Sequence, residues 1–385
     1  MRNRIVIAGS LAQRPGKGGH AWVFLQYLLG FQRLGWDVLF LDRLEPEMCY
    51  DASGEPAPLE RSENLHYLLR VIGAYGLEDS FAVLDGQGRS VGLSKAHVIA
   101  QVRESALLIN VMGFLQDPEI LDAAPTRVFL DIDPGFPQMW QDLGLARPLS
   151  GHDRYVTIGE NIGRPDCTIP TCGIDWITTP QPVVLDEWRT GESTPWTGFA
   201  GVGAWRGPFA PIEYRGATYG LRVHEFRNFF DLPRATRETF TIALDIDPAD
   251  ARDIKALHSA GWSVVKPQVV VAEPWTYREF IHRSSAEFMV AKGMYVRSNS
   301  GWFSDRSICF LASGRPVLAQ ETGFSRQLPV GNGLIAFSTL EEAADGAAAI
   351  AADPRRHGRA ALSVAREHFD SDRVLTGMLE KLGVA

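Results

Sequence analysis

The chain has 385 residues, of which 45% are hydrophobic and 22% are charged, so it can bury a large core and is neither disordered nor collagen-like. Its 38 lysines and arginines against 46 aspartates and glutamates give a net charge of -8. A nucleic-acid-binding protein is not expected, because such proteins need a strongly cationic face. The length favours two domains.

Neither a membrane-spanning segment nor a disulfide framework is expected. No apolar stretch reaches the roughly 18 residues that a spanning helix needs, and the apolar start at Ile5 to Ala8 is too short for a signal peptide. The 4 cysteines form no CxxC pair and are too sparse for a disulfide framework. We therefore expect a cytoplasmic protein with reduced thiols, no integral membrane segment and no metal site.

The first half of the chain alternates apolar runs of strand length with helical patterns, which is typical of a parallel sheet covered by helices. Strands are predicted at Ile5–Ala8, Trp36–Leu41, Phe81–Leu84, Leu107–Met112, Arg127–Ile132 and Arg154–Ile158, with helices at Ala21–Leu34, Glu63–Tyr75 and Lys95–Glu104. These elements predict one doubly wound domain over residues 1–174.

Residues 175–196 contain three prolines and few helical signals, so they predict an extended linker. A second α/β series follows over residues 197–365, and a C-terminal helix within residues 366–385 could cross back to the first domain. The predicted strands are Gly198–Val202, Phe240–Asp245, Trp262–Lys266, Glu287–Val290, Pro316–Ala319 and Leu334–Phe337. The fold class is therefore α/β, with two Rossmann-like doubly wound domains facing a cleft, where ligands bind at the C-terminal strand ends.

A glycine-rich loop, Gly16 to His20, lies between the first strand and the first helix. Glycines let the backbone approach a ligand, although the loop matches neither the dinucleotide fingerprint nor the phosphate loop ending in GK[ST]. Near a helix N-terminus the helix dipole favours the neutral imidazole, so His20 is a candidate general base. The alternative is that His20 only caps the helix.

Two aspartates, Asp131 and Asp133, end the fifth strand on one face of it. Either could act as a base or orient a catalytic histidine. The alternative for Asp133 is ordinary turn chemistry before Pro134, and that for Asp131 is a cap. Two carboxylates without a third ligand do not define a metal site.

Polar ligand-binding residues are predicted at two places in the second domain. The first strand there ends in a glycine turn followed by Arg206, which suits a diphosphate, with Arg222 and Arg227 as reserve cations. The segment 297–323 places a polar loop after a strand and then a helix start, which suits a phosphate, and carboxylates that suit a sugar diol. For Ser304 and Asp305 helix capping is the alternative. The predicted residues are Gly203, Arg206, Asn299, Ser300, Gly301, Ser304, Asp305, Arg306, Glu321, Thr322 and Gly323.

The second half of the chain resembles the donor half of GT-B glycosyltransferases in the order and spacing of its motifs. These motifs are Gly314–Ala319, Thr322–Gly323, Gly331–Phe337 and Leu340–Ala343, and the runs DIDPGF, NIGRPDCTIPTCGIDW and SGWFSDRSICFLASGRPVLAQETGF are similar to a bacterial group of largely uncharacterised glycosyltransferases. The Gly18-Gly19-His20 run is similar to the acceptor loop of GT-B enzymes, in which some inverting members place a catalytic histidine. The chain differs in having Cys309 near the place where retaining members usually carry a glutamate.

The resemblance implies a transferase, with hexosyl transfer favoured, that moves a sugar from a nucleotide diphosphate sugar to a hydroxyl or amine of a small-molecule or glycan acceptor. Arg206, the loop at Ser300 and the helix start at Asp305 would stabilise the departing diphosphate, so no metal or cofactor is expected. His20, aided by Asp131 or Asp133, would deprotonate the acceptor. A nucleotide-sugar epimerase of the same fold and a non-catalytic sugar-nucleotide binding protein are the alternatives.

Overall fold

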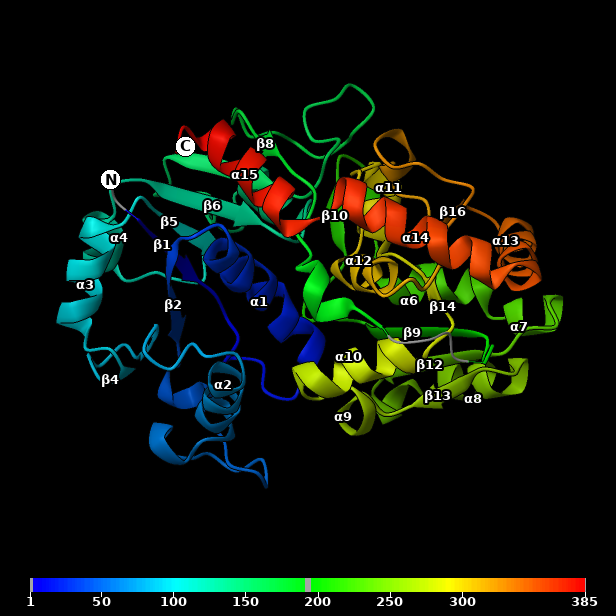
Figure 1. Cartoon of the computed structure of the whole chain (residues 1–385), viewed down its shortest axis with the longest axis horizontal. Coiled ribbons are helices and arrows are strands. Elements are labelled where there is room, and N and C mark those ends of the chain that lie inside the picture. Colours follow the sequence, from blue (N-terminus) through cyan, green and yellow to red (C-terminus); the bar gives the residue numbers. More distant parts are fainter. Residues whose placement is uncertain (1–2, 191–194, 385) are drawn as a thin grey trace.

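The computed structural model describes residues 3–190 and 195–384, which form two α/β domains lying side by side (Figure 1). Each domain has its own sheet, and strands end where glycine, proline or polar residues interrupt the apolar runs. The two sheets confirm the predicted pair of doubly wound domains.

The N-terminal sheet has the strand order β4-β3-β2-β1-β5-β6-β7-β8, and only β4 is antiparallel to its neighbour. Alternate side chains of β1 point to opposite faces, so Ile5 and Ile7 join one apolar cluster whereas Val6 and Ala8 join another. The strands are β1 (Arg4–Ala8), β2 (Asp37–Arg43), β3 (Phe81–Leu84), β4 (Ser90–Gly92), β5 (Leu107–Val111), β6 (Arg127–Asp131), β7 (Arg154–Thr157) and β8 (Ile177–Thr178).

The C-terminal sheet has the order β13-β12-β9-β14-β15-β16, and its strands are all parallel. The chain winds outward from β9 in one direction and from β14 in the other, so the strand order reverses between these two strands. The strands are β9 (Phe199–Ala204), β12 (Phe240–Asp245), β13 (Ser263–Val265), β14 (Ala286–Met289), β15 (Val317–Gln320) and β16 (Leu334–Phe337), with a separate hairpin of β10 (Ile212–Tyr214) and β11 (Ala217–Tyr219).

Helices cover both sheets. In the first domain they are α1 (Gly18–Arg33), α2 (Glu63–Ala74), α3 (Lys95–Glu104), α4 (Pro118–Ala123) and α5 (Phe136–Asp142). In the second half they are α6 (Arg222–Phe226), α7 (Leu232–Ala235), α8 (Ala251–Ala260), α9 (Pro267–Val270), α10 (Pro274–Arg283), α11 (Gly293–Ser298), α12 (Asp305–Ala312), α13 (Leu340–Ala352), α14 (Pro354–His368) and α15 (Ser371–Leu382). No helix among the described residues is long and apolar enough to cross a membrane.

Two segments differ from the sequence prediction. The predicted linker contributes β8 to the N-terminal sheet and then forms a short 3-10 helix, Leu185–Trp188, whose Trp188 is buried. Four residues of that linker, 191–194, lie outside the described residues. The loop at Ser298 follows helix α11 instead of a strand, because the chain turns into a helix soon after β14 ends.

The C-terminal helix α15 lies against α1 of the first domain, whereas α14 lies against the second (Figure 1). Gly30 of α1 has no Cβ, and one built there would lie 2.5 Å from Leu375 of α15. The Nε atom of Arg33 donates to Oδ1 of Asp372 at 3.0 Å. The C-terminal segment therefore connects the two domains, in addition to the segment that follows β8.

Candidate functional site

The site is built around Arg222, which lies where the strand order of the C-terminal sheet reverses. Its Nε donates to the carbonyl of Val290, just after β14, at 3.0 Å, and its Nη1 approaches the carbonyl of Ala204, at the end of β9, at 3.4 Å. Ligands of doubly wound sheets bind beside the carboxyl ends of the two strands at such a reversal. Arg222 is therefore positioned to meet an anion there.

Arg222 has no carboxylate partner among the described residues, and its contacts are backbone carbonyls. Burial lowers the pKa of its guanidinium to about 10, and the positive charge of Arg306 adds to that effect, so Arg222 is still a cation at neutral pH. A Cβ on Gly203 would collide with the Arg222 guanidinium. Glycine at this position thus makes room for the cation at the strand end.

A second cation, Lys292, precedes α11 in the segment after β14 and joins the two domains. Its Nζ lies 2.6 Å from Oδ2 of Asp133, which follows β6 in the first domain, and Tyr295 donates to the other Asp133 oxygen. The ammonium also lies 5.0 Å from the centre of the Phe136 ring and 5.6 Å from that of Phe209. Asp133, predicted as catalytic, is thus engaged in an interdomain ion pair.

His20 lies in the first turn of α1, beside the end of β1. Its Nε2 is 3.1 Å from both the hydroxyl and the carbonyl oxygen of Ser10, and its ring meets Phe24 edge-on at 5.1 Å. A carbonyl only accepts, so a bond to it places the proton on Nε2 and leaves Nδ1 as the basic nitrogen. Burial lowers the pKa of His20 to about 4, so the imidazole is neutral at pH 7.

Gly18 and Gly19, predicted as an acceptor loop, are packed against the second domain. A Cβ on Gly18 would collide with the backbone of Glu273, and one on Gly19 would lie 2.8 Å from the ring of Tyr277. The amide of Gly18 donates to the Val271 carbonyl at 3.1 Å. Both glycines therefore allow α1 to approach α10 closely.

Asp131, the other predicted catalytic carboxylate, is 0% exposed. Its Oδ2 accepts from Gln138 at 2.7 Å and from Thr157 at 2.8 Å, and its Oδ1 accepts from the amide of Asp133 at 3.0 Å. Burial raises the pKa of its carboxyl to about 6. These bonds fix the turn that carries Asp133, so Asp131 holds Asp133 in position.

Arg206 and Arg306, predicted to bind a diphosphate, have carboxylate partners instead. The Arg206 side chain is half exposed and forms a two-pronged ion pair with Asp250, in which Nε lies 3.0 Å from Oδ2. Arg306 is buried and its Nε is paired with Glu287, which is itself fully buried on β14. Neither arginine joins Arg222 at the strand ends.

The predicted polar loop at Asn299 to Gly301 lies against Asn161 of the first domain. The Asn161 amide donates to the Ser300 carbonyl, and its side chain donates to the Asn299 carbonyl, both at 3.0 Å. A Cβ on Gly301, where φ is +73°, would lie 2.8 Å from the Asn161 nitrogen. Gly323 is packed against the same Asn161 side chain.

The remaining predicted donor residues stabilise local structure. Ser304 caps α12 by accepting from the amide of Arg306 at 3.2 Å, which is the capping role foreseen as its alternative. Glu321 accepts from the amide of Thr322 at 3.0 Å and from that of Gly323 at 2.5 Å. Thr322 is buried and donates to the Trp302 carbonyl.

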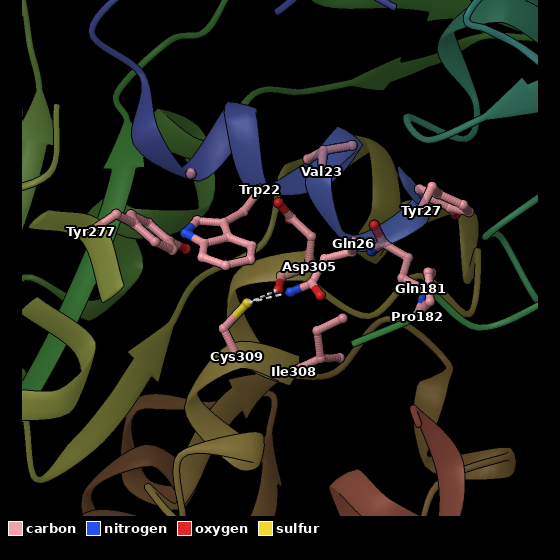
Figure 2. Close-up of a pocket in the computed structure, with 11 residues that line it drawn as sticks. Trp22, Val23, Gln26, Tyr27, Gln181, Pro182, Tyr277, Asp305, Ile308 and Cys309 are labelled. Atoms are coloured by element: carbon pink, nitrogen blue, oxygen red, sulfur yellow. Dashed lines mark hydrogen bonds between the residues drawn. The ribbon is translucent and has the colours of Figure 1, made fainter. Parts of the chain in front are cut away.

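Asp305 faces a cavity between the domains, together with side chains of α1 and α10 (Figure 2). The cavity has a volume of about 10 Å³, which is close to the lower limit for one water molecule. On its wall, Gln26 of α1 donates to the sulfur of Cys309 at 3.8 Å. The start of α12 is thus covered by the first domain and has no room for a nucleotide.

The structure therefore places Gly203 and Arg222 at the ends of β9 and β14, and Lys292 and Asp133 beside them at the domain boundary. The sequence named Arg222 only as a reserve cation and did not name Lys292. His20 lies in the first domain, at the end of β1. A further ion pair, between Lys17 and Asp245 at 2.5 Å, crosses between the domains beside β9. No group of three or more potential metal-ligating side chains occurs within the described residues.

Comparison with known proteins bears on the fold. No protein-family model matches the chain, and no curated protein matches it. A solved α-glucosyltransferase in complex with UDP is 12% identical, with 99% of each chain covered and a TM-score of 0.58. HepE of Anabaena in complex with UDP-glucose gives 12% identity, coverage of 99% of this chain and 100% of that one, and a TM-score of 0.58. Sucrose-phosphate synthase of Thermosynechococcus elongatus is 11% identical, with 99% of this chain and 98% of that one covered and a TM-score of 0.57. The chain accordingly has the GT-B fold that its sequence motifs predicted.

Proposed function

We propose that the protein is a glycosyltransferase that moves a sugar from a nucleoside diphosphate sugar to a hydroxyl or amine of an acceptor. The observation that carries the proposal is Arg222, a partly buried cation at the strand reversal of the second domain that pairs with no carboxylate in the described part of the chain. A cation held in this way by backbone carbonyls is suited to pair with diphosphate oxygens. The UDP and UDP-glucose bound to two proteins of this fold support the same ligand class.

Stabilising the departing diphosphate is the task assigned to Arg222, with Lys292 as a second cation nearby. Negative charge grows on the diphosphate as the glycosidic bond breaks, and cations fixed beforehand stabilise it most strongly in the transition state. Lys292 would have to exchange part of its contact with Asp133 for the ligand. Because two cations are available, the proposed reaction needs no metal ion.

The residue assigned to remove the proton from the acceptor is His20. Its imidazole is neutral at pH 7 because burial lowers its pKa to about 4, and its contact with the Ser10 carbonyl fixes the ring. A neutral imidazole accepts a proton from an acceptor hydroxyl as the new glycosidic bond forms. This role fits a displacement that inverts the configuration of the sugar.

Titration of nucleoside diphosphates tests the proposal directly. UDP, GDP, ADP and dTDP, each also as its glucose conjugate, are titrated by calorimetry into the wild type and two arginine variants. At least one of them should bind, and Arg222→Gln should weaken it by roughly 10- to 150-fold, as expected for loss of a charged hydrogen bond.

Arg206→Gln is the matched control, because Arg206 is paired with Asp250 at the surface. It should bind the same ligand as tightly as the wild type. Absence of binding by all eight compounds, or equal losses in the two variants, would contradict the proposal.

A further inference from the structure

A second cavity lies on the first domain, at the opposite end of α5 from Phe136 and Lys292. It is open to solvent and has a volume of about 730 Å³, enough for a small molecule. Its wall includes Gln141, Asp142, Ser150, Tyr155 and Thr171 of the first domain, and Arg215 at the tip of the β10–β11 hairpin of the second. We call it the α5–hairpin cavity.

The polar groups on the wall are incompletely used by the protein. The Oε1 atom of Gln141 is buried and has no hydrogen-bond partner among the described residues. Asp142 accepts from the hydroxyl of Tyr214 at 2.6 Å and lies 3.8 Å from Arg215, and both contacts use Oδ2. Oδ1 of Asp142 thus has no hydrogen-bond partner among the described residues and can accept from a ligand hydroxyl.

The character of the wall favours a neutral, hydroxyl-rich ligand. Its one carboxylate, Asp142, and its one guanidinium, Arg215, offset each other, so the cavity has no strong preference for an ion. Tyr155 supplies an aromatic side, backed by Trp176 at 5.7 Å between ring centres. A carboxylate that accepts from hydroxyls, beside an aromatic face, is the chemistry that recognises a carbohydrate.

The position of the cavity relates it to the site between the domains. Helix α5 begins at Phe136, which contacts Lys292, and ends at Asp142 in the cavity. Its seven residues span about 10 Å at 1.5 Å per residue. A group bound in the cavity is therefore too far from Lys292 to react there. It is near enough to be one part of a larger molecule whose other end reacts.

We propose that the α5–hairpin cavity binds a carbohydrate unit of the acceptor, and hence that the acceptor is an oligosaccharide or polysaccharide. The inference rests on the proposed transferase function and adds the class of its acceptor. The hairpin completes the cavity, because Arg215 comes from the second domain and Tyr214 is bonded to Asp142 across the domain boundary.

A glycan array probed with the full-length chain tests the inference without requiring catalysis. The wild type should retain at least one class of oligosaccharide on an array that includes microbial glycans. Ser150→Trp fills the cavity from an exposed position and should lower that signal at least tenfold, and Asp142→Asn should also weaken it. Ser259→Trp, on the exposed side of α8 in the other domain, is the matched control and should bind as the wild type does. Equal melting temperatures would show that the variants are folded.

The inference is overturned if the wild type retains no glycan, or if Ser150→Trp retains it as well as the wild type does. The nucleotide titration separates this result from the proposed function. Nucleotide binding without glycan binding would contradict the acceptor subsite and leave the proposed transferase function standing. Glycan binding that Ser150→Trp abolishes, together with no nucleotide binding, leaves the cavity as a carbohydrate site and removes the transferase.

Discussion

Both domains have glycines near the junction of their first strand with the next element, yet these glycines make different contacts: two of them open α1 in the first domain, and one lies in β9 in the second. In the first domain, Gly18 and Gly19 allow α1 to lie against the second domain, and the chemical group beside them is His20. In the second domain, Gly203 leaves room for the guanidinium of Arg222. Glycine at a strand end therefore marks a close approach, but the partner that approaches can be a helix of another domain or a side chain of the site.

The largest expected effect tests whether the first turn of α1 takes part in the reaction as well as in packing between the domains. His20→Ala should slow the chemical step by about 10²- to 10⁴-fold, because a general base is lost, and leave donor affinity unchanged. Single-turnover transfer to a glycan found on the array measures this rate. Asp131→Asn is the comparison, since that buried group supports the turn and should mainly lower stability. A His20→Ala rate within a few-fold of the wild-type rate would remove the histidine from the mechanism.

His20 should also make the stability of the protein depend on pH. His20 has a pKa of about 4 in the folded chain and 6.5 as its ordinary value, so the unfolded chain binds more protons between these values. The free energy of unfolding should therefore rise with pH from about 4 to 6.5, by at most about 3 kcal/mol and by less if the ring is partly hydrated.

Urea titrations at several pH values, compared between the wild type and His20→Gln, isolate this contribution. Asp42 and Asp131 act with the opposite sign, because burial raises their pKa values to about 7 and about 6, but both are present in the two proteins. Parallel pH profiles for the wild type and the variant would contradict the assignment.

The role of Gly203 in β9 is tested by adding one carbon atom. In Gly203→Ala the new Cβ collides with the Arg222 guanidinium and displaces it, so nucleoside diphosphate affinity should fall about 10- to 100-fold, as for a lost charged hydrogen bond. Gly377→Ala is the control, since among the described residues no atom beyond its own stretch of helix lies within 4 Å of its added Cβ. Calorimetric titration of both variants decides the matter, and unchanged affinity in Gly203→Ala would separate Arg222 from the ligand.

The smallest effect concerns the packing of Gly18 at the start of α1 against the second domain. Gly18→Ala places a Cβ against the backbone of Glu273, so the free energy of unfolding should fall by about 1 to 2 kcal/mol. Chemical denaturation measures it, and Gly377→Ala, inside α15, should instead gain about 0.5 to 1 kcal/mol. A Gly18→Ala variant as stable as the wild type would show that α1 and α10 do not need so close an approach.

Local signals in the sequence predicted most of the fold. The strands Phe240–Asp245 and Leu334–Phe337 and the helix Lys95–Glu104 have their predicted bounds, because apolar runs and flanking polar residues define them locally. The short strands β4 and β8 were missed, since two or three residues carry no periodic pattern. Their pairing depends on the neighbouring strands.

The candidate site was harder to predict, because its members meet only after folding. Arg206 directly follows the glycine turn in sequence but turns outward to Asp250, whereas Arg222 returns to the strand end after the β10–β11 hairpin. The segment 297–323 is rich in polar groups because it meets Asn161 and α1 of the other domain, a partner that sequence spacing does not identify.

The chain passes between the domains twice, and the two passages are bonded to each other. The amide of Val183 donates to the Phe369 carbonyl at 2.7 Å, and the amide of Ser371 donates to the Val183 carbonyl at 2.9 Å. Two crossings joined in this way restrict twisting and sliding, because either motion would break these bonds. An opening of the domains that keeps these bonds would pivot near Val183, so the largest displacements would fall on the parts of the two domains farthest from that residue.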